Sequence, residues 1–231
     1  MEKYSIGLAE NHIIAIMNNK RVLISTGSPS SIGEMPEINI LGRVHKLAGS
    51  LQGLDIKQIS ASLKTDINAL LGMDIMSQFI FYISHGIQAM ICSDYFINFK
   101  ESMHEFPIKI VDHLPVLEVK IAGVTIKMIL DTGSKLSYLD AGLLAGMRNI
   151  DIQETFYPGA GIFVSDIYLV PIDIKGKSRD IFFGRVPEAL SPQLAARDCM
   201  GVLGSDIFKY YNIQFNFKNS TIWLVDKGAA R

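Results

Sequence analysis

Two short stretches of this sequence repeat an order of residues that suits acid-base chemistry. Residues 22–33 read VLISTGSPSSIG, and residues 128–139 read MILDTGSKLSYL. Both contain apolar residues, one small polar residue, Thr-Gly-Ser, and another serine three positions further on. They differ at the position before Thr-Gly, which is Ser25 in the first stretch and Asp131 in the second. The repeat therefore has one carboxyl group for two equivalent positions.

Two such positions facing each other would suit the activation of water. Hydrolysis without a covalent intermediate needs a base that deprotonates water and an acid that protonates the carbonyl oxygen. Two neighbouring carboxyl groups fill both roles, because they share one proton and cannot both ionise readily. The Ser25 hydroxyl can hold a water molecule, but it does not ionise at a useful pH. Asp131 alone is expected to be ionised near neutral pH unless burial raises its pKa.

Short β-strands are predicted to position both stretches. Apolar runs rich in Ile, Val, Phe and Tyr are separated by Gly, Asn, Asp or Pro, which indicates a mostly β protein. The predicted strands of the first half are YSIGLAE, HIIAIMNN and KRVLISTGS, and those of the second half are FPIKIV, LPVLEVKIAG and VTIKMILDTGS. Asn18-Asn19 and Ala122-Gly123 are predicted to form the turns between the last two strands of each half.

A second pair of motifs follows in the same order. ALLGMDIMSQFIFYIS, from Ala69, resembles GVLGSDIFKYYNIQFNF, from Gly201. Each has two apolar residues, a glycine, one variable residue and Asp-Ile before a strand-like run. The matched positions are Gly72 and Asp74 in the first half and Gly204 and Asp206 in the second. Two matched motifs in one order predict an internal duplication.

The duplication predicts two similar halves on either side of a polar segment. Residues 1–100 form the half with the Ser-Thr-Gly loop, and residues 106–231 form the half with the Asp-Thr-Gly loop. The interval between the paired motifs is longer in the second half.

These motifs together resemble those of the retropepsin and pepsin-like aspartic proteases. The similarity rests on an apolar strand before Asp-Thr-Gly-Ser, a later Gly-x-Asp, and a second set in parallel, and it covers most of both halves. It implies a mostly β, bilobal acid-protease fold with pseudo-twofold symmetry, built as a single-chain tandem of two retropepsin-like halves. In that family the two loops meet beneath a β-hairpin flap.

The resemblance also implies roles for the loop residues. Asp131 and Ser25 hold the two catalytic positions, although Ser25 lacks the carboxyl group. The threonines are expected to hydrogen-bond across the loops and the serines to hydrogen-bond the catalytic position of their own loop, while the glycines allow a close approach. The supporting residues are Thr26, Gly27, Ser28, Thr132, Gly133 and Ser134. The resemblance places Asp74 and Asp206 at the start of a structural helix or turn, where capping is expected rather than catalysis.

The flap is predicted from the second half. FYPGAGIFVSDIYLV, from Phe156, has Pro158, Gly159 and Gly161 between two β-like runs and could close over a substrate. Tyr157 would then line the cleft, although an exposed aromatic residue on an ordinary hairpin is the alternative. The corresponding stretch of the first half, from His45, matches poorly.

The leading functional hypothesis is an aspartic endopeptidase that has lost one catalytic carboxyl group. One positioned acid or base contributes about 10² to 10⁴ in rate, so the chain should be inactive or very slow as a monomer. The alternative is a pseudoprotease that binds extended peptides by strand addition and side-chain pockets. A third possibility is a homodimer that pairs two Asp131 loops. Ser25 could be natural, could be an introduced substitution, or could be compensated by that second molecule.

Composition and charge limit the partners, cofactors and cellular compartment that can be expected. The formal net charge is −1 with mixed signs, so no nucleic-acid partner is expected. The chain lacks a signal-like segment and a bilayer-length apolar run, which predicts a cytoplasmic protein with no membrane partner. Scattered histidines and the absence of a CxxC motif predict neither metal nor cofactor. The expected partner is a peptide or protein substrate. Cys92 and Cys199 are expected to be buried free thiols.

Overall fold

The computed structural model describes residues 1–9, 11–99, 103–158 and 160–227. The elements of residues 1–99 are β1 (Glu2–Ala9), β2 (His12–Met17), β3 (Lys20–Ile24), β4 (Ile32–Gly33), β5 (Glu37–Ile40), β6 (Arg43–Lys46), β7 (Ser50–Leu51), β8 (Leu54–Asp55), α1 (Ile56–Ser62), β9 (Ala69–Leu71), α2 (Met73–Met76), β10 (Ile80–Ser84) and β11 (Ala89–Ser93). The elements from residue 103 onward are β12 (Met103–Pro107), β13 (Lys109–Val111), β14 (Leu114–Ile121), β15 (Val124–Leu130), β16 (Ser137–Leu139), α3 (Ala141–Leu144), β17 (Asn149–Tyr157), β18 (Gly161–Ile174), β19 (Lys177–Arg185), α4 (Ser191–Ala195), β20 (Gly201–Leu203), η1 (Ser205–Lys209), β21 (Tyr211–Asn216), η2 (Phe217–Asn219) and β22 (Thr221–Asp226).

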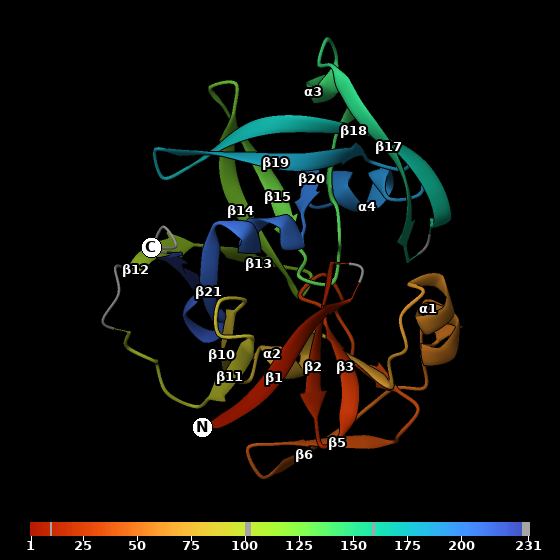
Figure 1. Cartoon of the computed structure of the whole chain (residues 1–231), viewed down its shortest axis with the longest axis vertical. Coiled ribbons are helices and arrows are strands. Elements are labelled where there is room, and N and C mark those ends of the chain that lie inside the picture. Colours follow the sequence, from red (N-terminus) through yellow and green to blue (C-terminus); the bar gives the residue numbers. More distant parts are fainter. Residues whose placement is uncertain (10, 100–102, 159, 228–231) are drawn as a thin grey trace.

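Most of these strands form two large sheets in two lobes (Figure 1), and β5-β6 and β7-β8 form two small two-stranded sheets. One sheet has ten strands in the order β12-β22-β21-β10-β11-β1-β2-β3-β9-β4. The other has eight strands in the order β13-β14-β15-β20-β16-β19-β18-β17. In Figure 1 the long strands β17, β18 and β19 lie in the upper lobe, and β1, β2 and β3 lie in the lower lobe. The mostly β, bilobal fold predicted from the sequence is confirmed.

The same local order of strands occurs in both sheets. The series β2-β3-β9-β4 corresponds to β14-β15-β20-β16, with a parallel pair at its centre in each case. Ile24 is opposite Leu71 in the first series, and Leu130 is opposite Leu203 in the second. Each of the two loops therefore begins where the central parallel strand ends.

The hairpins that lead into these loops have the predicted turns. Asn18 and Asn19 have φ values of 50° and 60°, and Ala122 and Gly123 have φ values of 49° and 82°. Two consecutive residues with positive φ match the twist of the flanking strands. Both turns are thus confirmed.

The pairing of β10 with β21 shows the pseudo-twofold axis. Tyr82 and Gln214 hold equivalent places after the two Gly-x-Asp motifs, and they are paired directly in this antiparallel ladder. A residue that pairs with its own counterpart lies on the axis that relates the two similar series of strands. β12, β21 and β22, which come from the second half of the sequence, thereby lie in one sheet with β10 and β11. The proposed limits of the halves, at residues 100 and 106, stay a prediction.

The segment FPIKIV, which precedes the second hairpin, differs from its prediction. FPIKIV was expected to be one strand, but the structure divides it into β12 and β13. These are edge strands of different sheets, so the chain crosses from one lobe to the other at Ile108.

Cys92 and Cys199 are buried and free, as predicted. In the described part of the chain, no helix has the length and apolarity needed to cross a membrane.

Candidate active site

The two Thr-Gly loops meet between the lobes, and they bring Ser25 against Asp131. The Ser25 hydroxyl donates a hydrogen bond to Asp131 Oδ1 over 3.2 Å. The same oxygen accepts from the backbone N–H of Gly27 at 3.1 Å and of Gly133 at 2.8 Å. Asp131 is therefore held by donors from both loops, and the position facing it carries a hydroxyl group.

The threonines join the loops reciprocally. The Thr26 N–H donates to Thr132 Oγ1 at 3.1 Å, and the Thr132 N–H donates to Thr26 Oγ1 at 3.0 Å. Each hydroxyl also donates to the opposite approach strand, from Thr26 to the Leu130 carbonyl and from Thr132 to the Ile24 carbonyl. Both side chains are fully buried, and their polar atoms are satisfied by one another. These are the cross-loop hydrogen bonds that the resemblance implied.

The glycines leave room for this contact. A Cβ at Gly27 would overlap the Asp131 carboxyl group, and a Cβ at Gly133 would overlap the Ser25 side chain. In the downstream motifs, a Cβ at Gly72 or Gly204 would lie 2.6 or 2.7 Å from a carbonyl oxygen of the adjoining loop. The loops can approach this closely only because these positions have no side chain.

The two serines hydrogen-bond the catalytic position of their own loop through their backbone N–H groups, whereas their hydroxyl groups bond elsewhere. Ser28 donates to the Ser30 carbonyl at 2.7 Å, and Ser134 donates to the Leu136 carbonyl at 2.6 Å. The reason is local, because an acceptor two residues further on is within reach of a short hydroxyl side chain. The backbone N–H of Ser28 donates to the Ser25 carbonyl at 3.4 Å, and that of Ser134 donates to the Asp131 carbonyl at 3.2 Å. The predicted contacts of the two serines with their own catalytic positions are therefore present, but they are made by the backbone and not by the hydroxyl groups.

Asp74 and Asp206 lie in the first turn of α2 and η1, but Gly72 and Gly204 are the N-cap residues. Asp74 accepts hydrogen bonds from both the N–H and the hydroxyl of Ser31, at 3.0 and 2.6 Å. Asp206 accepts from the Phe182 N–H and pairs with Lys209 at 3.0 Å. Their role is structural, as expected, although they tie neighbouring segments to the helix instead of capping it.

Burial governs the charge of Asp131. The residue is 5% exposed. Desolvation raises the pKa of its carboxyl group, while the hydrogen bonds from Gly133, Gly27 and Ser25 act in the opposite direction. Burial therefore shifts the Asp131 carboxyl group towards its protonated form, although no second carboxylate is beside it.

The β17–β18 hairpin lies over the loops, and its tip carries the predicted flap residues. Tyr157 is paired with Gly161 at the end of the ladder, and Gly161 has a φ of 74° that suits glycine. Tyr157 is 9% exposed and lines the cleft, so it is not the exposed aromatic residue of the alternative. Gly159 lies outside the described residues.

The cleft has a volume of about 120 Å³ and is mostly apolar. Ser25, Gly27, Ser28, Asp131, Gly133, Ser134 and Tyr157 are the predicted site residues that line it. Thr26 and Thr132 lie buried beneath. The structure thus brings all the described loop residues together and adds the flap tip above them.

The flap also contacts the first half. Phe156 packs against the apolar cluster that includes Ile56, Ile59 and Leu63 of the α1 region. Glu154 accepts a hydrogen bond from Lys64 at 2.8 Å. In Figure 1 the lower end of β17 comes down beside α1. The β17–β18 hairpin therefore rests on the opposite lobe at this side of the cleft.

Several cleft residues were missed by sequence reasoning. Gln193 and Arg197 come from α4 and the segment after it, and Leu51 and Gln52 come from the β7–β8 hairpin. His12 does not line the cleft, but it supports the second loop, because its Nδ1 donates to the Gly133 carbonyl at 2.8 Å. None of these residues belongs to a repeated motif, so the sequence carried no signal for them.

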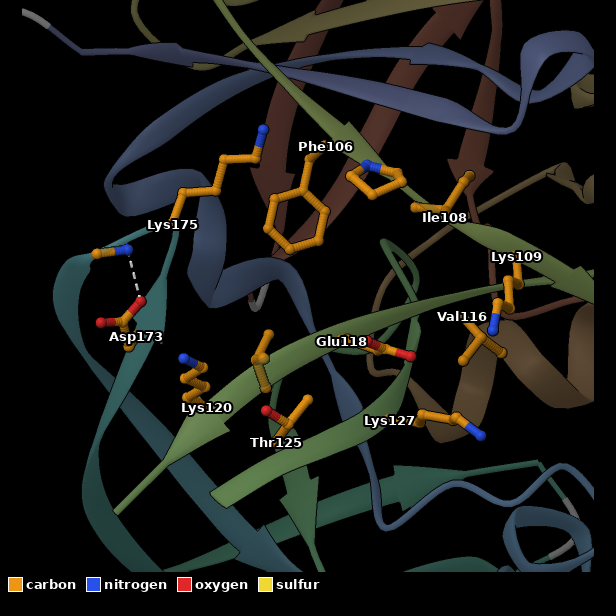
Figure 2. A pocket seen from close by; sticks show the side chains of 13 residues that line it. Phe106, Ile108, Lys109, Val116, Glu118, Lys120, Thr125, Lys127, Asp173 and Lys175 are labelled. Atoms are coloured by element: carbon orange, nitrogen blue, oxygen red, sulfur yellow. Dashed lines mark hydrogen bonds between the residues drawn. The ribbon is translucent and has the colours of Figure 1, made fainter. Parts of the chain in front are cut away.

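A larger cavity of about 570 Å³ lies elsewhere, between the β12–β13 segment and the outer face of β14 and β15 (Figure 2). Phe106, Ile108 and Val116 line it together with several lysines. No residue of the paired loops contributes to it. Within the described ranges, no group of three or more His, Cys, Asp or Glu side chains is arranged to hold a metal ion.

Comparison with known proteins yields similarities among solved structures alone. No protein-family model matches the chain, and no curated protein sequence does. Among solved structures, the chain is similar to the solution structure of Simian Foamy Virus (mac) protease, with 19% sequence identity and a TM-score of 0.31. The match covers 40% of this chain and 90% of that chain.

Proposed function

We propose that this chain is an aspartic-endopeptidase-type protein, formed by two retropepsin-like halves in tandem, whose cleft holds an extended peptide or protein segment. Ser25 stands at one of the two catalytic positions, so peptide hydrolysis is absent or very slow in the chain as it is. The observation that carries the proposal is the contact of Ser25 with Asp131 above the reciprocal threonine hydrogen bonds.

The geometry supports a dyad that lacks one member. The Ser25 Oγ lies at hydrogen-bond distance from Asp131 Oδ1, which is where a second carboxyl oxygen would share the proton. The N–H groups of Gly27 and Gly133 already point to this oxygen and hold the carboxyl group in orientation. A water molecule between two carboxyl groups at these positions would have both a base and an acid beside it.

The test is to restore the missing carboxyl group. Ser25→Asp should produce cleavage of a diverse peptide library, and the gain should be at least about 10²-fold over the unmodified chain. The matched control is Ser25→Asp combined with Asp131→Asn, which should return the rate to the starting level. If Ser25→Asp folds and gives no Asp131-dependent cleavage between acidic and neutral pH, the proposal of an endopeptidase site is wrong.

A second candidate is a pseudoprotease that binds peptides without cutting them. It is favoured by the closed hydrogen bonding of Asp131 Oδ1, which accepts from three donors of its own protein without a second ionisable group. This candidate predicts measurable affinity of the unmodified chain for peptides together with no product. Rapid cleavage by the unmodified chain would eliminate it.

We further propose that residues 1–100 and 106–231 are the two duplicated halves, and that the protein acts as a cytoplasmic monomer. A homodimer pairing two Asp131 loops would have to give up the β10–β21 ladder and the threonine contacts within the chain. Light scattering under assay conditions distinguishes the monomer from the homodimer. If dilution dissociates a dimer and abolishes activity over the same concentration range, the proposal of a monomer is wrong.

A further inference from the structure

We propose that Arg197 makes the cleft selective for peptides with a carboxylate side chain on one side and a bulky apolar side chain on the other. The inference rests on the proposed function, because it concerns the peptide held in the same cleft. Arg197 lines that cleft with Ser25 and Asp131, and it lies shortly after α4.

The charge of the cleft singles out this residue. Among the described lining residues, Asp131 and Arg197 alone are of the Asp, Glu, Lys or Arg type. Burial raises the pKa of Asp131 and favours its neutral form, whereas a guanidinium stays protonated. The cleft therefore presents one cation to a bound peptide, within walls that are mostly apolar.

The hydrogen bonds of Arg197 are incomplete. Its Nη1 donates to the Gln193 carbonyl at 2.7 Å, and its Nη2 lies 3.3 Å from Asp112. Its Nε is buried without a hydrogen-bond partner in the described structure. A buried donor left unpaired is unfavourable, so the guanidinium would gain from a further acceptor that reaches its accessible edge.

A carboxylate is the acceptor that suits this group. The fork of N–H donors on a guanidinium matches two carboxylate oxygens, and such bonds are about twice as strong as neutral ones. Asp112 does not already serve this purpose, because it is 64% exposed and a pair of that kind is worth about 0–1 kcal/mol. The side chain of Arg197 is 18% exposed, so part of it remains accessible from the cleft.

The opposite side of the cleft is apolar. Leu51, Ile59, Leu63 and Phe156 line it from β7, from α1 and the residue that follows it, and from the flap. In Figure 1, α4 lies in the upper lobe and α1 in the lower lobe, with the end of β17 between them. An extended peptide passing between the lobes would therefore meet Arg197 on one side and these apolar residues on the other.

Binding of paired peptides to the unmodified chain tests the inference without any need for cleavage. The peptides carry two central leucines and differ only by Glu or Gln at one position, scanned on either side. At one position, the Glu peptide should bind about tenfold tighter than the Gln peptide. High salt should reduce this ratio only in part, because the charge pair is partly buried.

Three variants distinguish binding of a peptide carboxylate by Arg197 from a purely structural role of this residue. Arg197→Met should bring the ratio of Glu to Gln affinities close to one, whereas Arg148→Met, which removes an exposed arginine outside the cleft, should leave it unchanged. Asp112→Asn should raise the ratio, because the guanidinium no longer shares a carboxylate. The Asp112→Asn variant tests the inference even if Arg197→Met fails to fold.

The outcomes are distinguishable. Equal binding of the Glu and Gln peptides at every position, with measurable affinity for the leucines, overturns the role of Arg197 and leaves peptide binding intact. No binding of any peptide overturns the proposed function and this inference together. A ratio that Arg197→Met leaves unchanged assigns the preference to another residue and also overturns the inference.

Discussion

The carboxyl group of Asp131 has the most unusual surroundings of the loop residues. It is nearly fully buried, it accepts three hydrogen bonds at one oxygen, and its neighbour across the axis is a hydroxyl. Burial raises its pKa above the ordinary value of an aspartate. The group is therefore more easily protonated in the folded chain than in the unfolded chain.

The first prediction follows from this shift. An acid with a raised pKa in the folded state binds more protons there, so its contribution to stability falls as pH rises from the unfolded pKa, about 3.9, through the folded pKa. Asp131→Asn keeps the accepting oxygen and removes the titration. The variant should therefore have a higher Tm than the unmodified chain at pH 7, and this gain should shrink near pH 3.

Thermal unfolding at both pH values measures the effect, at about 2–4 °C for each kcal/mol in a protein of this size. Asp66→Asn is the control, because Asp66 is exposed and lies outside the cleft. It should change Tm little at either pH. A gain for Asp131→Asn that is equal at both pH values would show that charge burial is not its cause.

At the scale of elements, the β17–β18 hairpin is held to the first lobe by two contacts of different strength. Phe156 packs on the apolar cluster near α1, whereas Glu154 and Lys64 form an exposed ion pair. Burying part of an aromatic side chain contributes more than such a pair, which is worth about 0–1 kcal/mol. The apolar contact should therefore decide how firmly the flap is closed.

We accordingly expect Phe156→Ala to loosen the flap and Glu154→Gln to leave it nearly unchanged. Amide hydrogen exchange of β17 and β18 near Tyr157 should be faster in Phe156→Ala, and affinity for peptides should fall. Exchange in β14 and β15 serves as an internal reference. Faster exchange in Glu154→Gln than in Phe156→Ala would contradict this order.

Elements differed in how well the sequence predicted them. The strands that enter the loops and their turns were predictable, because alternating apolar residues and Asn-Asn or Ala-Gly pairs are local signals. The break at Ile108 was not predictable, since it depends on two sheet edges that are formed by distant strands. The contacts of Ser28 and Ser134 with their own loops follow from short spacing, and a carbonyl two residues further on takes each hydroxyl.

At the scale of the whole molecule, the two halves of the sequence contribute strands to one sheet and side chains to one apolar core. β10 of the first half pairs with β21 of the second, and one apolar cluster contains residues of both halves, such as Phe81 and Phe215. Unfolding one half would expose the face that the other half covers. We expect the lobes to unfold together.

The single tryptophan makes this testable. Trp223 lies in β22, next to Gln214 of β21 and Glu105 of β12. Its fluorescence and the far-UV circular dichroism should follow one denaturant transition with a common midpoint. A tryptophan transition at a clearly lower denaturant concentration would show that the shared strands separate before the lobes unfold.

The sequence by itself determined the repeated loops, the mostly β class and the position where a serine stands opposite the aspartate of the other loop. These features depend on residue type and short spacing, which one chain displays directly. Tertiary structure alone decided that Arg197, His12 and Phe156 join the site, and that Asp131 is buried enough to favour its protonated form. Those properties depend on distances between residues far apart in the chain, and on exclusion of water, which no local pattern encodes.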